Sequence, residues 1–186
     1  MSKQYRMIVA LVVIGVLSLA CGLGQVASPT QAPVAVGGGQ QLEQWASGAS
    51  ASSQYGDPAW AAIQATGAPD TDECGDYDTA WASLEADSPY EWLELTYRTA
   101  VIPQEIKIYE TYNPGSIISV AVGTANFEHT IIWEADPRPN TACPYVLTIP
   151  VDGFEQAVNS VRIEFDQSII GSWNEIDAVQ LIGSRP

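Results

Sequence analysis

In residues 90–97, YEWLELTY, apolar side chains recur at every second position, so that Leu93, Leu95 and Tyr97 fall on one face. A period of two residues is typical of a β-strand that buries one face. Residues 160–165, SVRIEF, repeat the pattern, with apolar residues inward and Arg162 and Glu164 outward. Shorter runs predict further strands at residues 105–109, 117–122, 130–133, 145–149 and 176–182.

Turn signals separate these runs, at residues 113–115, 136–140 and 151–153. Seven or eight short strands without intervening helices predict an all-β fold: an antiparallel β-sandwich or jelly roll of about eight strands. One short helix is predicted at residues 57–64, because Asp57 could cap it and Pro58 suits its first position.

The segment Tyr112-Asn113-Pro114-Gly115 predicts a tight turn, because proline fixes φ and glycine allows φ above zero. Glu110 stands just before it and is expected to accept a hydrogen bond from the turn backbone. A role for Glu110 in ligand binding is the alternative.

The composition excludes two classes of protein. Of 186 residues, 46% are hydrophobic, which is too many for a disordered chain. Seven basic residues stand against 22 acidic ones, a net charge of −15, which disfavours nucleic acid as a partner. His129 is the only histidine in the sequence, so a Ser/His/Asp enzyme would depend on it.

The first twenty residues have the pattern of an export signal. Lys3 and Arg6 precede an apolar run of 14 residues at positions 7–20, shorter than the roughly 20 residues that span a membrane. The run ends in Ser18-Leu19-Ala20-Cys21, which resembles a relaxed bacterial lipobox. It predicts a signal peptide over residues 1–20 and lipid on Cys21. A plain cleaved signal peptide or an uncleaved anchor is the alternative.

Residues 21–41 are rich in Gly, Ser, Pro and Gln, and predict a flexible linker before a domain at residues 42–184. Removal of residues 1–20 would leave five basic and 22 acidic residues, a net charge of −17. Such a chain is repelled by an anionic bilayer, so attachment to the extracytoplasmic side of a membrane would depend on the lipid.

Export leaves Cys74 and Cys143 as an even pair in an oxidising compartment, which predicts a disulfide between them. Two buried free thiols are the alternative. A zinc site is disfavoured, because the two cysteines are far apart and no histidine is near.

Four blocks of sequence carry a resemblance to a known family. They are residues 94–115, Trp133 with residues 137–139, residues 143–144 and residues 172–179. Together they resemble the galactose-binding-domain-like module of pappalysin metalloproteases and of an F-box protein with leucine-rich repeats. The resemblance implies a discoidin-like jelly roll. It implies no protease or ubiquitin-ligase activity, because those activities belong to other domains.

An acidic stretch at residues 67–78 contains five Asp and Glu residues, which are the oxygen ligands that Ca²⁺ prefers. The resemblance implies a structural Ca²⁺ between such a loop, ending in Thr-x-Trp, and a glutamate near the last strand. Asp70, Thr79 and Glu175 match those places. A solvated acidic loop is the alternative.

Six tryptophans divide by their surroundings in the sequence. Trp81, Trp92 and Trp133 lie in strand patterns and are predicted in the core. Trp45, Trp60 and Trp173 lie near loops and are candidates for stacking on sugar rings. The sequence therefore predicts a non-catalytic, lipid-tethered module that binds carbohydrate or, alternatively, a surface protein. An enzyme such as a glycosidase is disfavoured, since the chain has neither a nucleophile elbow nor a His-Glu-x-x-His motif.

Overall fold

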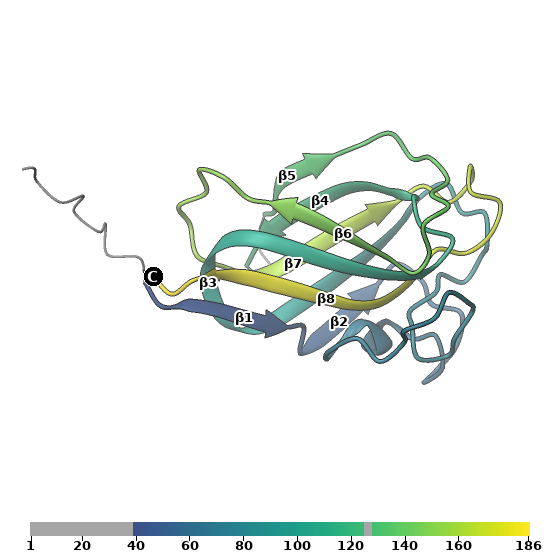
Figure 1. Ribbon diagram of the computed structural model, residues 1–186, viewed down its shortest axis with the longest axis horizontal. Coiled ribbons are helices and arrows are strands. Elements are labelled where there is room, and N and C mark those ends of the chain that lie inside the picture. The colour runs from purple at the N-terminus through teal and green to yellow at the C-terminus, as the bar shows by residue number, and fades with distance from the viewer. Residues whose placement is uncertain (1–38, 125–127) are drawn as a thin grey trace, which may run out of the picture. The chain divides into compact units, whose positions relative to one another are not determined.

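The structure is a computed structural model that describes residues 39–124 and 128–186. The predicted signal peptide, Cys21 and most of the predicted linker lie outside the described residues. The described residues form an all-β fold of eight antiparallel strands, which confirms the predicted class (Figure 1). The strands are β1 (Gln41–Trp45), β2 (Gly48–Ala51), β3 (Glu91–Tyr112), β4 (Ile117–Gly123), β5 (Thr130–Glu134), β6 (Tyr145–Pro150), β7 (Val158–Phe165) and β8 (Glu175–Ser184).

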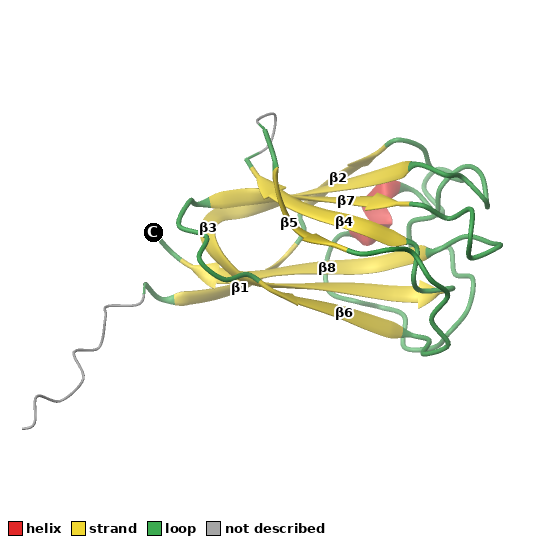
Figure 2. Cartoon of the chain, turned by 90° about the horizontal axis from the view of Figure 1, so that it is seen from above, coloured by secondary structure: helices red, strands yellow, loops and turns green. Residues whose placement is uncertain are grey.

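The strands form two layers that share β3 (Figure 2). One layer has the order β1-β8-β3-β6, and the other contains β2, β3, β7, β4 and β5. Inward side chains of both layers make the core, which includes Leu93, Leu95, Ile106, Ile108, Val161, Ile163 and Phe165.

The two strands predicted at residues 90–97 and 105–109 are one strand of 22 residues, which corrects the prediction. Its first part pairs with β2 and β7, and its last part pairs with β6 and β8. The register shifts between Thr96 and Val101, and such an irregularity lets a strand bend from one layer to the next. Gly183 lies beside this bend, where a Cβ atom would be 2.3 Å from the carbonyl oxygen of Ile102.

The helix predicted at residues 57–64 is also corrected. A short 3₁₀ helix is found instead at Ala62–Ala65, and no side chain caps it. Trp60 has φ of 54°, which is outside the helical region, so residues 57–60 form a loop rather than a first helical turn.

The predicted turn at residues 113–115 is present, and it supports a second loop. Gly115 has φ of 117°, and a Cβ atom there would lie 2.0 Å from the carbonyl oxygen of Arg138. The amide of Arg138 donates to the carbonyl oxygen of Gly115 at 2.9 Å. Glu110 accepts a hydrogen bond from the amide of Gly115 at 3.2 Å. Burial raises the pKa of Glu110 to about 7.

Tryptophans in strand patterns are not all in the core. Trp81 is fully buried, and Trp133 is half-buried and packs against the core. Trp92 is wrongly predicted, because it lies on the outer face of its strand, where the guanidinium of Arg162 sits 4.3 Å from its ring centroid. Its neighbour Leu93 takes the inward place instead. Among the described residues, no helix has the length and apolar character needed to cross a membrane.

Candidate functional site

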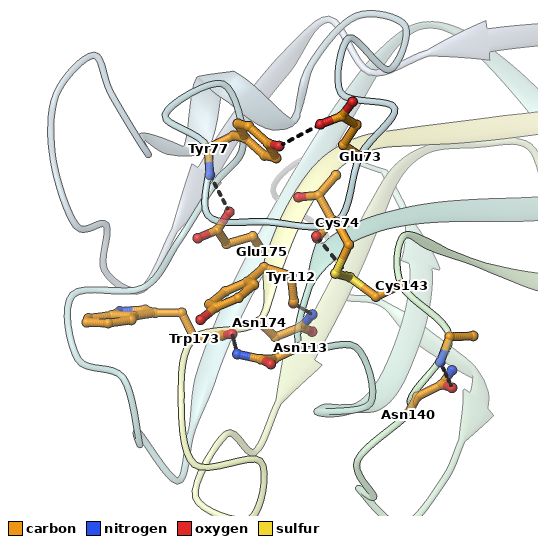
Figure 3. Close-up of a disulfide and its surroundings, with 12 residues drawn as sticks. Glu73, Cys74, Tyr77, Tyr112, Asn113, Asn140, Cys143, Trp173, Asn174 and Glu175 are labelled. Carbon is orange, nitrogen blue, oxygen red and sulfur yellow. Dashed lines mark hydrogen bonds between the residues drawn. A yellow bond between two sulfur atoms is a disulfide. The ribbon is translucent and has the colours of Figure 1, made fainter.

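A disulfide joins two loops at one end of the sandwich (Figure 3). Cys74 and Cys143 are bonded, with their Cα atoms 5.1 Å apart, which confirms the predicted pair. The amide of Gly75 donates to the carbonyl oxygen of Thr111 at 2.9 Å, which holds the same loop against β3. The acidic stretch is therefore fixed to the scaffold at residues 74–75.

An aromatic pocket lies beside this loop. The ring centroid of Tyr55 is 5.3 Å from that of Trp60 and 5.5 Å from that of Trp173, and both pairs are nearly perpendicular. The three rings line a partly open pocket of about 100 Å³, and its lining is completed by Asp76, Ala82 and Glu175. We refer to these six residues as the aromatic pocket.

Hydrogen bonds from both indoles fix the rings. The indole nitrogen of Trp60 donates to the carboxylate of Asp76 at 2.9 Å, and that of Trp173 donates to the carbonyl oxygen of Ser83 at 2.9 Å. The amide of Tyr55 donates to the carbonyl oxygen of Ala82. Ala82 and Ser83 follow directly after the buried Trp81, so the pocket rests on a rigid part of the core.

Trp81 itself is anchored to the last strand. Its backbone exchanges two hydrogen bonds with Ile176, at 2.8 and 3.1 Å. Glu175 precedes Ile176, so the start of β8 places its side chain in the lining of the aromatic pocket.

Glu175 is the most buried charged group in the lining, with 1% of its surface exposed. Its carboxylate accepts a hydrogen bond from the amide of Tyr77 at 3.1 Å (Figure 3). Burial, together with the nearby Asp76, raises the pKa of Glu175 to about 8. None of the six lining residues is Lys, Arg or His.

The structure brings together two of the three tryptophans proposed for sugar stacking. Trp60 and Trp173 share the aromatic pocket, whereas Trp45 lies on β1 with its ring 5.5 Å from that of Tyr109. The sequence analysis missed Tyr55, because it follows a serine-rich stretch that has no strand or helix periodicity.

The residues proposed for Ca²⁺ contact two different sets of neighbours. The Asp70 amide donates to Asp177 at 3.4 Å, and the hydroxyls of Thr79 and Thr71 lie 2.9 Å apart. Glu175 instead lies with Asp76 and Tyr77.

Burial raises the pKa of Asp177 to about 6. Carboxylates and hydroxyls near Asp70 are ligands of the right kind for Ca²⁺. No three His, Cys, Asp or Glu side chains converge among the residues described, so the ion remains a prediction.

A wider groove, of about 430 Å³, lies between the strand ends of β4, β5 and β6. Trp133, Arg138 and Tyr145 contribute to its lining. Apolar and charged side chains both line the groove. Within the described residues, its aromatic rings make no contact with one another, unlike the rings of the aromatic pocket.

The single histidine does not form a catalytic relay. Its Nε2 atom lies 3.0 Å from the hydroxyl of Ser160 and 3.5 Å from the carboxylate of Glu94. A relay needs the two nitrogens of the ring to contact the nucleophile and the acid separately. Ser160 is also fully buried.

Comparison with protein families identifies the domain. The model of the pappalysin-1 SD scarf domain, C-terminal, matches residues 36–186. The chain belongs to this family. A relative of the SD scarf domain is the F-box/LRR-repeat protein 4 of Bos taurus, 25% identical over 105 residues. The alignment covers 51% of the chain and 17% of that relative's length.

Solved structures that share the fold of this SD scarf domain include carbohydrate-binding modules and a lectin domain. Chitosan-binding module 1 of a chitosanase/glucanase from Paenibacillus sp. IK-5 is 15% identical, with a TM-score of 0.57, over 73% of this chain and 94% of its own. A family 32 carbohydrate-binding module from C. perfringens, in complex with galactose, is 18% identical with a TM-score of 0.53, over 76% and 99%. The lectin domain of lectinolysin, complexed with Lewis B antigen, is 15% identical with a TM-score of 0.55, over 74% and 92%.

Proposed function

We propose that the domain is a non-catalytic carbohydrate-binding module whose sugar site is the aromatic pocket. The observation that carries the proposal is the convergence of Tyr55, Trp60 and Trp173 beside two carboxylates. Aromatic faces pack against the apolar faces of sugar rings, and carboxylates accept hydrogen bonds from sugar hydroxyls. The carbohydrate-binding structural neighbours support the same class of ligand.

A glycan array, followed by calorimetry on the best ligands, tests the proposal. We expect Tyr55→Ala to weaken binding strongly and to leave the fold intact, because 51% of the surface of Tyr55 is exposed. Trp173→Ala should have the same effect on binding. Trp45→Ala is the matched control, since it removes a half-buried tryptophan outside the pocket and should leave affinity unchanged.

A protein partner is the second candidate for what the domain binds. Ile131 is 54% exposed on β5, which lies at the edge of its sheet and could contact another protein. This alternative would be favoured over the sugar site by two results together: the folded domain binds no glycan on the array, and Ile131→Ser abolishes its binding to a protein partner.

We also propose that lipid on Cys21 tethers the domain to the extracytoplasmic side of a membrane. The apolar run that ends in Ser18-Leu19-Ala20-Cys21 supports this. Cys21→Ala should release the protein from the membrane fraction or leave an unprocessed precursor. An unchanged mature mass together with unchanged membrane partition would contradict the tether.

A further inference from the structure

On the basis of the sugar site proposed above, we propose that its ligand is an amino sugar, whose positively charged ammonium group enters the aromatic pocket. The ammonium would lie beside the three rings, pair with the carboxylate of Asp76 and form no ion pair with Glu175, whose carboxyl group would offer it a hydrogen-bond acceptor. The sugar ring that bears it would pack against the exposed side of Tyr55.

The first argument is that Asp76 has no positive partner in the pocket. Asp76 and Glu175 both line the pocket, and the lining contains no basic residue. Elsewhere in the domain, partly buried acids contact a base: Glu94 lies 3.7 Å from Arg162, and Glu105 lies 3.1 Å from Lys107. The carboxylate of Asp76 therefore has no basic neighbour in the lining, and a cationic group of a ligand could pair with it.

The second argument is the arrangement of the rings. Trp60 and Trp173 each stand nearly perpendicular to Tyr55, with centroids 5.3 and 5.5 Å away. An ammonium in the cavity that these rings line could lie within the roughly 6 Å at which a ring centroid attracts a cation. A neutral hydroxyl gains little from the ring faces, so the rings favour an ammonium over a hydroxyl.

The third argument is size. The cavity, about 100 Å³, is far smaller than the roughly 300 Å³ at which pockets for whole small ligands begin. It therefore admits one substituent of a sugar and not the ring. An N-acetyl group is bulkier than an ammonium and neutral, so acetylation of the amine should weaken binding for reasons of both volume and charge.

The experiment compares two oligosaccharides of equal length that differ only in acetylation. Calorimetry of the full chain, with a chelator present to remove metal ions, measures the affinity for a glucosamine oligomer and an N-acetylglucosamine oligomer at about pH 6, where a sugar amine is protonated. We expect the glucosamine oligomer to bind at least about tenfold more tightly. Asp76→Asn keeps the acceptor for Trp60 and should remove most of that preference.

Two controls separate the pocket from the general negative charge of the chain. Asp152→Asn removes one exposed acid on the loop between β6 and β7 and should leave the preference intact. A lysine oligomer of matched charge should bind weakly, and its binding should disappear at about 0.5 M NaCl, where charges are strongly screened.

The outcomes distinguish failure of the amino-sugar inference from failure of the sugar site. Equal or tighter binding of the N-acetylated oligomer, lost in Tyr55→Ala, would overturn the amino-sugar inference and keep the sugar site. The inference would also be overturned if Asp76→Asn and Asp152→Asn reduced the preference equally. Binding of the lysine oligomer as tight as that of the glucosamine oligomer would overturn it as well. Failure of every saccharide to bind would overturn the sugar site and the inference together.

Discussion

Two clusters of acidic side chains in this domain have opposite surroundings. On the outer face of β3 and β7, Glu94 and Glu164 contact Arg162 at 3.7 and 3.4 Å. Hydroxyl groups donate to the same two acids: that of Ser160 to Glu94, and those of Tyr90 and Ser119 to Glu164. This cluster, which we call the paired face, satisfies its own charges on a sheet surface.

In the aromatic pocket, Asp76 accepts a hydrogen bond from the indole of Trp60 and Glu175 accepts one from the amide of Tyr77, and no base is among the lining residues. In a chain with 22 acidic residues, the presence of acids indicates little. The comparison teaches that an acidic pair indicates a ligand when a concave site leaves it without a positive partner.

The largest expected effect comes from loss of the disulfide, which fixes only the pocket end of the domain. Cys74→Ala with Cys143→Ala should lower the free energy of unfolding by roughly 4 kcal/mol, because the bond closes a loop with a sequence separation of 69. Chemical denaturation measures this. Because this is a loss of global stability, amides of the central strands should also exchange faster, and a variant with the denaturation midpoint of the parent would contradict the prediction.

Glu110 extends the comparison to a third environment, a fully buried acid whose partners are neutral. Its folded-state pKa of about 7 lies above the ordinary value of 4.5, so its contribution to stability is complete below about pH 4.5 and is lost as pH rises through 7. Glu110→Gln should therefore stabilise the domain at pH 8 by about 3 kcal/mol and change little at pH 4.5. Urea denaturation at both pH values tests this, and a gain that does not depend on pH would contradict it.

Calcium would alter the comparison by supplying a cation to the acidic loop. If Asp70, Thr79 and Glu175 hold the ion, millimolar Ca²⁺ should stabilise the domain by roughly 2.7 kcal/mol at a hundredfold excess over Kd, and Mg²⁺ should do less. Thermal melts measure the rise, and both Asp70→Asn and Glu175→Gln should remove most of it. NaCl of equal ionic strength is the control; if it matches Ca²⁺, the loop holds no specific ion.

The smallest effect is expected on the paired face. Arg162→Met removes the ion pairs and the cation–π contact with Trp92 but keeps an apolar stem over the ring, so the loss should be about 1 kcal/mol for this partly exposed group. Urea denaturation measures the change. Saccharide affinity should not change, and a parallel loss of binding would show that the two clusters are coupled.

The sequence predicted the parts of the fold that follow from local periodicity. Alternation at Leu93 and Leu95, and at Val161 and Ile163, identified central strands correctly. It did not reveal that residues 91–112 form one strand, because a bend between layers depends on pairing with β7 and β8. It also placed Trp92 inward, although the period of two around Leu93 assigns Trp92 to the outer face.

The candidate site was predicted in part, for a similar reason. Trp60 and Trp173 were selected because they lie near loops, yet they are 113 positions apart and only the fold shows that they meet around Tyr55. The helix predicted at residues 57–64 failed where Trp60 takes a left-handed backbone conformation that directs it toward Asp76. Local propensity carries no information on such long-range contacts.

The pairing of β1 with β8 has a mechanical consequence. Gln41 lies opposite Ser184, whereas Glu175 begins β8 about 30 Å away at roughly 3.3 Å per residue (Figure 1). A pull on the chain at Gln41, resisted by a ligand at Glu175, runs parallel to both strands. Because antiparallel hydrogen bonds are perpendicular to the strands, this pull shears all the β1–β8 bonds at once and does not peel them in turn. If the aromatic pocket binds a ligand and the N-terminal segment is tethered, as proposed, this arrangement would resist tension between the two.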